Sequence, residues 1–118
     1  MAEHNKLGAS GEAAAASYLK TKGFTILACN YRYKKAEVDI IASHGKLLVF
    51  AEIKTRSSEK FGFPEDFVSD RKIALLLMAA EEYIYQTNWL HDIRFDILSV
   101  SVQPSGQFSI HHIEDAFH

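Results

Sequence analysis

The chain has 118 residues, 47% of them hydrophobic and 24% charged, so it is long enough to build one compact domain with a core. A single cysteine excludes an internal disulfide and the usual cysteine-based zinc sites, and the net charge of -2 argues against a protein that coats nucleic acid. No apolar run has the basic flank of a signal peptide or the length of a membrane span. We therefore expect a cytoplasmic protein that does not contact membranes.

The first predicted helix follows a short polar start. Ser10 is a suitable N-cap, and the helix runs through Glu12 to Lys20, with alanines on its inner face and Gly23 as its stop. Residues 8–11 contain two glycines and are predicted to form a flexible lead-in to the helix. Glu12 thus falls near the positive N-terminal end.

Three strands are predicted next, over residues 24–33, 37–42 and 47–55. Residues 43–46, Ser-His-Gly-Lys, form a tight turn between the last two strands. The three strands therefore make an antiparallel meander.

A loop and a second helix follow. Residues 57–68 include Gly62 and Pro64 and are predicted to be an exposed loop. The helix starts at Ser69 or Asp70 and runs to about residue 86. Its apolar residues recur at spacings of three and four and should cover the sheet: Ile73, Leu76, Leu77, Ala80 and Ile84.

The last part of the chain is predicted to complete the sheet. Residues 94–102 have a strong strand pattern after a helix and can return parallel beside the third strand, and residues 108–113 can add an edge strand. No repeat or linker marks a second domain, so residues 1–118 form one domain. The predicted fold class is α/β, with a mixed sheet (an antiparallel meander plus a parallel strand) flanked by helices.

Charged residues stand in two of these strands at positions that should be apolar. Glu52 and Lys54 share one face of their strand because side chains alternate, and Glu37 and Asp39 lie on the preceding strand. A hairpin loop with an even number of residues opposes positions whose numbers sum to an odd total, such as 39 and 52. That register places Asp39 and Glu52 on the same side of the sheet.

Two such carboxylates repel one another by about 4 kcal/mol at 4 Å and an effective dielectric near 20. A divalent cation resolves the repulsion, and oxygen ligands suit Mg2+ or Mn2+. Asp39 and Glu52 are the expected metal ligands, and Glu12 can complete the metal shell. A bound water would be the nucleophile, with Lys54 orienting it or stabilising the transition state. The expected catalytic residues are therefore Asp39, Glu52, Lys54 and Glu12.

This set, in this order, resembles the PD-(D/E)xK nucleases: an acid on the first helix, an Asp at a strand end and Glu-x-Lys on the next strand. Gly11-Glu12, residues 37–42 and residues 50–56 carry the likeness. The chain is more closely similar to the YraN-type uncharacterised bacterial family, over roughly residues 8 to 102. That resemblance implies a restriction-endonuclease-like fold, related to Holliday-junction resolvases, and metal-dependent hydrolysis of DNA, including branched or structured DNA.

Other interpretations of the acids stay open. Glu12 is also explained as a helix-dipole acid in the first turn, and Asp39 as a strand-end cap. Glu52 and Lys54 could be a same-face ion pair on a solvated sheet. Glu37 is either an additional acid of the metal site or a charge at the hairpin edge.

Candidate partners follow from the basic residues. Residues 30–60 carry a local excess of three positive charges. The family pattern favours Arg56 and Lys72 as nucleic-acid contacts, and Arg32, Lys34 and Lys35 are further candidates, although lysines on turns are often only solvated. The six histidines show no metal spacing and are expected at the surface. A homodimer is compatible with the sequence, and the alternative function is a non-catalytic nucleic-acid-binding module that retains the nuclease fold.

Overall fold

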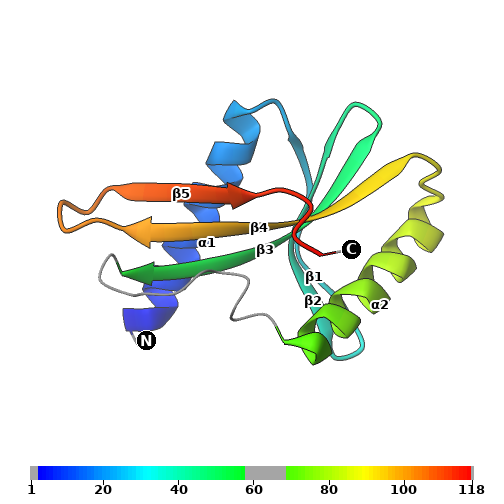
Figure 1. Ribbon diagram of the computed structural model, residues 1–118, viewed down its shortest axis with the longest axis horizontal. Coiled ribbons are helices and arrows are strands. Elements are labelled where there is room, and N and C mark those ends of the chain that lie inside the picture. Colours follow the sequence, from blue (N-terminus) through cyan, green and yellow to red (C-terminus); the bar gives the residue numbers. More distant parts are fainter. Residues whose placement is uncertain (1–2, 58–68, 118) are drawn as a thin grey trace.

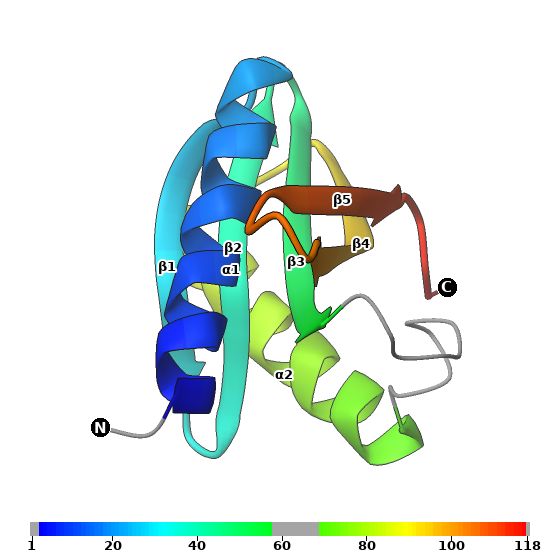
Figure 2. The same ribbon diagram turned by 90° about the vertical axis from the view of Figure 1, so that its left-hand side faces the viewer.

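The computed structural model describes residues 3–57 and 69–117, and shows a five-stranded sheet with one helix on each face (Figures 1 and 2). Helix α1 spans Glu3–Thr21 and helix α2 spans Asp70–Thr87. The strands are β1 Thr25–Tyr33, β2 Ala36–His44, β3 Leu47–Ser57, β4 Asp92–Val102 and β5 Phe108–Ile113. Apart from Ser57, the predicted loop over residues 57–68 lies outside the described residues.

The strands follow chain order across the sheet, β1-β2-β3-β4-β5. Strands β3 and β4 are parallel, and every other neighbouring pair is antiparallel. The connection between the parallel strands contains α2, as a parallel pair requires. The predicted α/β fold, a meander extended by a parallel strand and an edge strand, is confirmed.

The β2–β3 hairpin has the register that the site requires. Ile40 lies opposite Ala51 and His44 opposite Leu47, so opposed residue numbers sum to an odd total. The loop contains only Gly45 and Lys46, because β2 extends through Ser43 and His44 of the predicted turn, while β3 starts at Leu47 as predicted. Gly45 has a φ of 60°, which glycine adopts without steric cost at the first position of a two-residue hairpin loop.

The core has two layers, one on each face of the sheet. Between α1 and the sheet lie Ala15, Leu19, Ile40, Ala42, Val49, Ala51, Ile53, Leu98 and Val100. Between α2 and the sheet lie Ala36, Val38, Ile41, Leu48, Phe50, Leu76, Ala79, Ala80 and Phe95. Since Ala51 and Ile53 face α1, Glu52 between them faces α2.

Helix α1 begins at Glu3, so the predicted start after Ser10 is wrong. The glycines do not make a flexible lead-in, because Gly11 is buried where the helix touches β3. A Cβ atom built at Gly11 would overlap the Thr55 side chain and lie 2.7 Å from its Cγ2. Glycine inside the helix costs about 1 kcal/mol in propensity, and the close contact with the sheet explains its presence. Glu12 therefore lies well inside the helix and not in its first turn.

Helix α2 has defined ends. The Ser69 side chain caps the N-terminus by accepting a hydrogen bond from the Lys72 backbone N–H at 3.1 Å, and Asn88 closes the C-terminus in a left-handed conformation. Leu76 and Ala80 of the predicted apolar stripe are buried, whereas Leu77 is 43% exposed. Among the described residues, neither helix is long and apolar enough to cross a membrane.

Candidate active site

The candidate site lies where β2 and β3 separate. Their pairing runs from the hairpin to Ile40 opposite Ala51. One residue further along β2, Asp39 Oδ2 accepts a hydrogen bond from the Ile53 backbone N–H at 2.9 Å. Backbone N–H groups of a strand lie in the plane of the sheet and point toward a neighbouring strand, so the Asp39 carboxylate is held between β2 and β3.

Strand β2 is also irregular at this position. Val38 packs in the core layer of α2, but Ile40, two residues later, packs in the layer of α1. Residues two apart on a regular strand share a face, so the alternation breaks at Asp39. On the neighbouring strand, Asn30 has a φ of 55°, a left-handed conformation that asparagine tolerates better than most residues. The strand irregularity thus turns the Asp39 side chain into the gap.

The Glu52 carboxylate is buried, and its two oxygens have different surroundings. Glu52 is 3% exposed. Its Oε2 lies 3.7 Å from Lys54 Nζ and 3.3 Å from Lys72 Nζ. Its Oε1 is buried without a hydrogen-bond partner among the described residues. A buried carboxylate oxygen without a partner is costly, so Oε1 is suited to a ligand from outside the chain.

Burial and mutual repulsion perturb both acids. Burial, and then the charge of Asp39, raise the pKa of Glu52 to about 7, although Lys72 and Lys54 oppose the shift. Burial also raises the pKa of Asp39, against the opposing effects of the Ile53 N–H and Lys72. Perturbed carboxylates that share a site are common where a protein binds ions or performs acid–base chemistry.

Glu12 joins this cluster through electrostatics. Burial raises its pKa, and the charges of Asp39 and Glu37 raise it further, while a hydrogen bond from the Asn30 side chain acts in the opposite direction. Glu12 belongs to α1 and Glu52 faces α2, so the two acids approach Asp39 from different sides of the sheet. The helix-dipole explanation of Glu12 is wrong because the residue lies far from the helix start.

Of the basic residues predicted to contact nucleic acid, Lys72 lies inside the site, next to Glu52. Its position in the first turn of α2 brings its ammonium group nearer to Glu52 than that of Lys54. Arg56 follows Lys54 by two residues on β3, so the two share a face, and Arg56 is half-buried. The sequence alone gave no signal for the contact between Lys72 and Glu52.

The other basic candidates lie on the β1–β2 hairpin. Arg32, with a side chain 76% exposed, forms an ion pair with Glu37 at 3.6 Å, as a hairpin-edge charge would. Lys34 and Lys35 form the exposed turn, which in Figure 2 lies at the same end of the molecule as the N-terminal end of α1. The distance along β2 from this turn to Asp39 is roughly 10 Å at 3.3 Å per residue.

The oxygen donors of the site fit a hard divalent cation. Mg2+ retains several waters and usually takes one or two protein carboxylates, which Asp39 and Glu52 could provide. The unsatisfied Glu52 Oε1 is the donor that such an ion would engage. In the part of the chain that the structure describes, no three acidic, histidine or cysteine side chains form a ready-made metal cage. The fit therefore rests on the carboxylate pair, with Glu12 contributing negative charge nearby.

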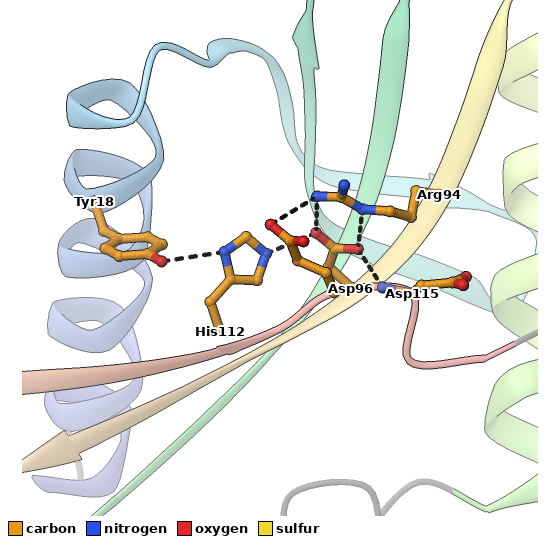
Figure 3. Close-up of polar contacts among 6 residues, drawn as sticks. Tyr18, Arg94, Asp96, His112 and Asp115 are labelled. Carbon is orange, nitrogen blue, oxygen red and sulfur yellow. Dashed lines mark hydrogen bonds and ion pairs between the residues drawn. The ribbon is translucent and has the colours of Figure 1, made fainter.

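A second buried acid lies on β4. Asp96 is fully buried and accepts hydrogen bonds from Arg94 Nε and Nη2, both at 2.8 Å, in a bidentate pair (Figure 3). His112 Nε2 lies 2.7 Å from Asp96 Oδ2, and the Asp115 backbone N–H donates to Oδ1 at 3.0 Å. The Tyr18 hydroxyl lies 3.2 Å from His112 Nδ1, which links α1 to this network.

This second cluster is structural, and sequence reasoning missed it. The expectation that the histidines lie at the surface is wrong for His112, whose side chain is 6% exposed because it faces α1 from β5. Burial alone would raise the pKa of Asp96, but the hydrogen bonds from His112, Arg94 and the Asp115 amide lower it. A charge between Phe95 and Ile97 in a buried strand is the same signal that singled out Glu52, and it could have identified Asp96.

Comparison with known proteins gives one consistent family. A sequence profile of the uncharacterised protein family UPF0102 matches residues 11–100. The chain is 48% identical over 117 residues to a UPF0102 protein of Christiangramia forsetii, covering 99% of this chain and 98% of the relative. It is 48% identical over 118 residues to one of Flavobacterium psychrophilum, covering 100% and 98%. A UPF0102 protein of Phocaeicola vulgatus is 41% identical over 118 residues, covering 100% and 97%.

Proposed function

The chain belongs to the UPF0102 family, and from this premise we propose that it is a nuclease that uses Mg2+ or Mn2+ to hydrolyse phosphodiester bonds in DNA, branched or otherwise structured DNA included. The observation that supports this proposal is the buried Glu52 carboxylate, with one oxygen facing two lysines and the other without a hydrogen-bond partner in residues 3–57 and 69–117. Asp39 beside it is the second proposed metal ligand.

A structural ion pair explains this arrangement poorly. An acid buried for stability has partners on both oxygens, because an unmatched buried charge is destabilising. Glu52 instead has a pKa raised to about 7 and one oxygen that finds no hydrogen-bond donor in the described part of the chain. Such a carboxylate is expected where an ion or substrate completes the coordination.

The side chains of the site have distinct proposed roles. Asp39 and Glu52 would hold the divalent ion, which supplies Lewis-acid stabilisation and an activated water when bound. Lys54, on the same face as Glu52, would stabilise negative charge that develops on the phosphate. Glu12 adds negative charge beside Asp39 and favours binding of the cation. Lys34, Lys35 and Arg32 on the β1–β2 hairpin, and Arg56 on β3, would contact the phosphate backbone.

The test is cleavage of duplex, single-stranded and four-way-junction DNA by the purified protein, with Mg2+ or Mn2+. Wild type should cut at least one of these substrates and stop on addition of a chelator. Glu52→Gln and Asp39→Asn should each lower the rate by about a thousandfold or more, since both remove a proposed ligand charge. Glu81→Gln removes an exposed acid of α2 and serves as the matched control with unchanged rate.

The outcomes separate this proposal from the non-catalytic alternative. Equal cleavage by wild type and Glu52→Gln would disprove the assigned site. Absence of cleavage, together with DNA binding that weakens with salt and survives Glu52→Gln, would identify a nucleic-acid-binding module without catalysis. Thermal unfolding of each variant tests whether a loss of activity reflects a loss of folding.

A further inference from the structure

Lys72 occupies a built position in the site. Its backbone N–H is fixed by the Ser69 N-cap at 3.1 Å, and its ammonium lies 3.3 Å from Glu52 Oε2. Its charge also lowers the pKa of both Asp39 and Glu52, so it acts on both proposed metal ligands. The side chain is 38% exposed and can therefore reach a bound ligand while remaining close to the buried acid.

Among the four charged side chains Asp39, Glu52, Lys54 and Lys72, the charges balance. Asp39 and Glu52 contribute two negative charges, and Lys54 and Lys72 two positive ones. The N-terminus of α2, which carries Lys72, adds a partial positive charge. A divalent ion in this neutral centre would leave about two positive charges for a ligand to match.

Two further acids, Glu12 and Glu37, lie on the β1 and β2 side of the four-residue centre. Glu37 is paired with Arg32 at 3.6 Å. Glu12 is repelled by the charges of Asp39 and Glu37 and hydrogen-bonded to the Asn30 side chain, so its negative charge stays on that side. These acids reduce the positive charge on the β1 and β2 side, so the excess is concentrated beside Lys54 and Lys72.

We propose that Lys72 is a second catalytic cation, which with Lys54 makes the loaded site complementary to a phosphoryl group that carries two negative charges. The inference rests on the proposed function. In hydrolysis of an internal diester, hydroxide forms the new P–O bond, the bond to the leaving oxygen breaks, and that oxygen takes up a proton. The transition state combines the charges of hydroxide and diester, so it carries two negative charges. A terminal phosphate monoester carries nearly two negative charges at neutral pH, so it presents the same charge to the site.

The first readout is binding of Mn2+ alone, measured calorimetrically at pH 8.5 without nucleic acid. Lys72→Met removes a cation next to a proposed ligand, so Mn2+ should bind about threefold more tightly or better. Arg71→Met removes an exposed charge from the preceding position of the same helix and should change the affinity by less than about twofold. Equal Mn2+ affinities for wild type and Lys72→Met would place Lys72 outside the metal centre and overturn the proposal.

The second readout is binding of small phosphates to the Mn2+-loaded protein. Wild type should bind thymidine 5′-monophosphate, with two charges, more tightly than dimethyl phosphate, with one. Lys72→Met should weaken thymidine 5′-monophosphate binding about tenfold or more, and Arg71→Met should not. No preference between the two probes in wild type would overturn the charge match.

The third readout is cleavage, which also identifies the source of the double charge. Lys72→Met should lower kcat about a hundredfold with little change in KM. Loss of a residue that only contacts the DNA phosphate backbone would instead raise KM. If the protein cleaves closed circular DNA, the doubly charged group is the transition state of an internal diester. If it cleaves only linear DNA with 5′-phosphate ends, the doubly charged group is a terminal phosphate monoester. Full activity in Lys72→Met would refute the role of Lys72 and leave the nuclease proposal intact. If wild type cuts no DNA, the nuclease proposal fails, and the phosphate probes still decide the role of Lys72.

Discussion

Glu52 and Asp96 are buried acids on neighbouring parallel strands, and they occupy adjacent rungs of the sheet. Ala51 lies beside Asp96, and Glu52 lies beside Ile97. The two side chains point to opposite faces, Glu52 toward α2 and Asp96 toward α1. Glu52 is 3% exposed and Asp96 is fully buried, so burial does not distinguish them.

Their hydrogen bonding does distinguish them. Both oxygens of Asp96 accept hydrogen bonds, and its pKa is lowered. One oxygen of Glu52 accepts no hydrogen bond from any residue that the structure describes, and the pKa of Glu52 is raised to about 7. A buried acid with complete hydrogen bonding stabilises the fold, whereas one with incomplete hydrogen bonding is available for a ligand.

The largest test of this contrast is Asp96→Asn. The substitution removes the buried counter-charge of Arg94 and disturbs the contact with His112, and should lower the free energy of unfolding by about 3–5 kcal/mol. Urea unfolding at pH 7 measures the change. Asp92→Asn, at the exposed start of the same strand, is the control and should stay within about 0.5 kcal/mol. A loss below about 1 kcal/mol in Asp96→Asn would remove the structural role assigned to the network.

Glu52→Gln should have the opposite sign. At pH 8 without metal the wild type carries a buried charge whose pKa lies near 7 against an ordinary value of 4.5. A shift of that size means that the charged Glu52 lowers the free energy of unfolding by about 3 kcal/mol. We expect Glu52→Gln to recover about 2 kcal/mol of this, since the substitution also removes the ion pairs with Lys54 and Lys72. Urea unfolding in the presence of a chelator measures the gain. A destabilised Glu52→Gln would show that Glu52 is a structural acid like Asp96.

The same two acids predict opposite pH limbs of stability. The folded state binds a proton at Glu52 more tightly than the unfolded state, so the free energy of unfolding should fall as pH rises from 4.5 to about 7. Asp96 has a lowered pKa, so its contribution is lost below its ordinary value of 3.8 as the pH falls. Glu52→Gln should flatten the neutral limb and leave the acid limb unchanged.

The smallest effect should come from the outer member of the network. Tyr18→Phe removes the hydroxyl 3.2 Å from His112 Nδ1 but keeps the ring, so the expected loss is about 1 kcal/mol. Thermal unfolding measures the change. Tyr85→Phe, at a site 82% exposed, is the matched control with no expected loss. If Tyr18→Phe were as damaging as Asp96→Asn, the network would act as one unit and not as a buried pair with an accessory contact.

Features that depend on neighbouring residues or regular periodicity were predictable from the sequence. Alternation along β3 placed Glu52 and Lys54 on one face, and an even number of loop residues gave the hairpin register, with Ile40 opposite Ala51. The parallel return of β4 followed from the intervening helix. These are local rules of strand geometry, which act over a few residues.

Contacts between distant elements were not predictable in this way. The approach of Lys72 to Glu52 depends on where α2 starts against β3, and the Tyr18–His112 contact joins α1 to β5. The predicted start of α1 was wrong because the glycines indicated a loop. In the structure, Gly11 lies inside the helix and allows the close approach of Thr55. No spacing in the chain encodes such tertiary contacts.

The hydrogen bond from Ile53 to Asp39 has an entropic consequence. A free aspartate samples several rotamers and would lose that freedom when it binds an ion. In this protein the hydrogen bond from the Ile53 N–H to Oδ2 fixes the Asp39 side chain when the protein folds. The other oxygen, Oδ1, then has a fixed orientation before any ion binds. Ordering of Asp39 therefore adds little to the entropic cost of ligand capture, and a single backbone amide accounts for that preorganisation.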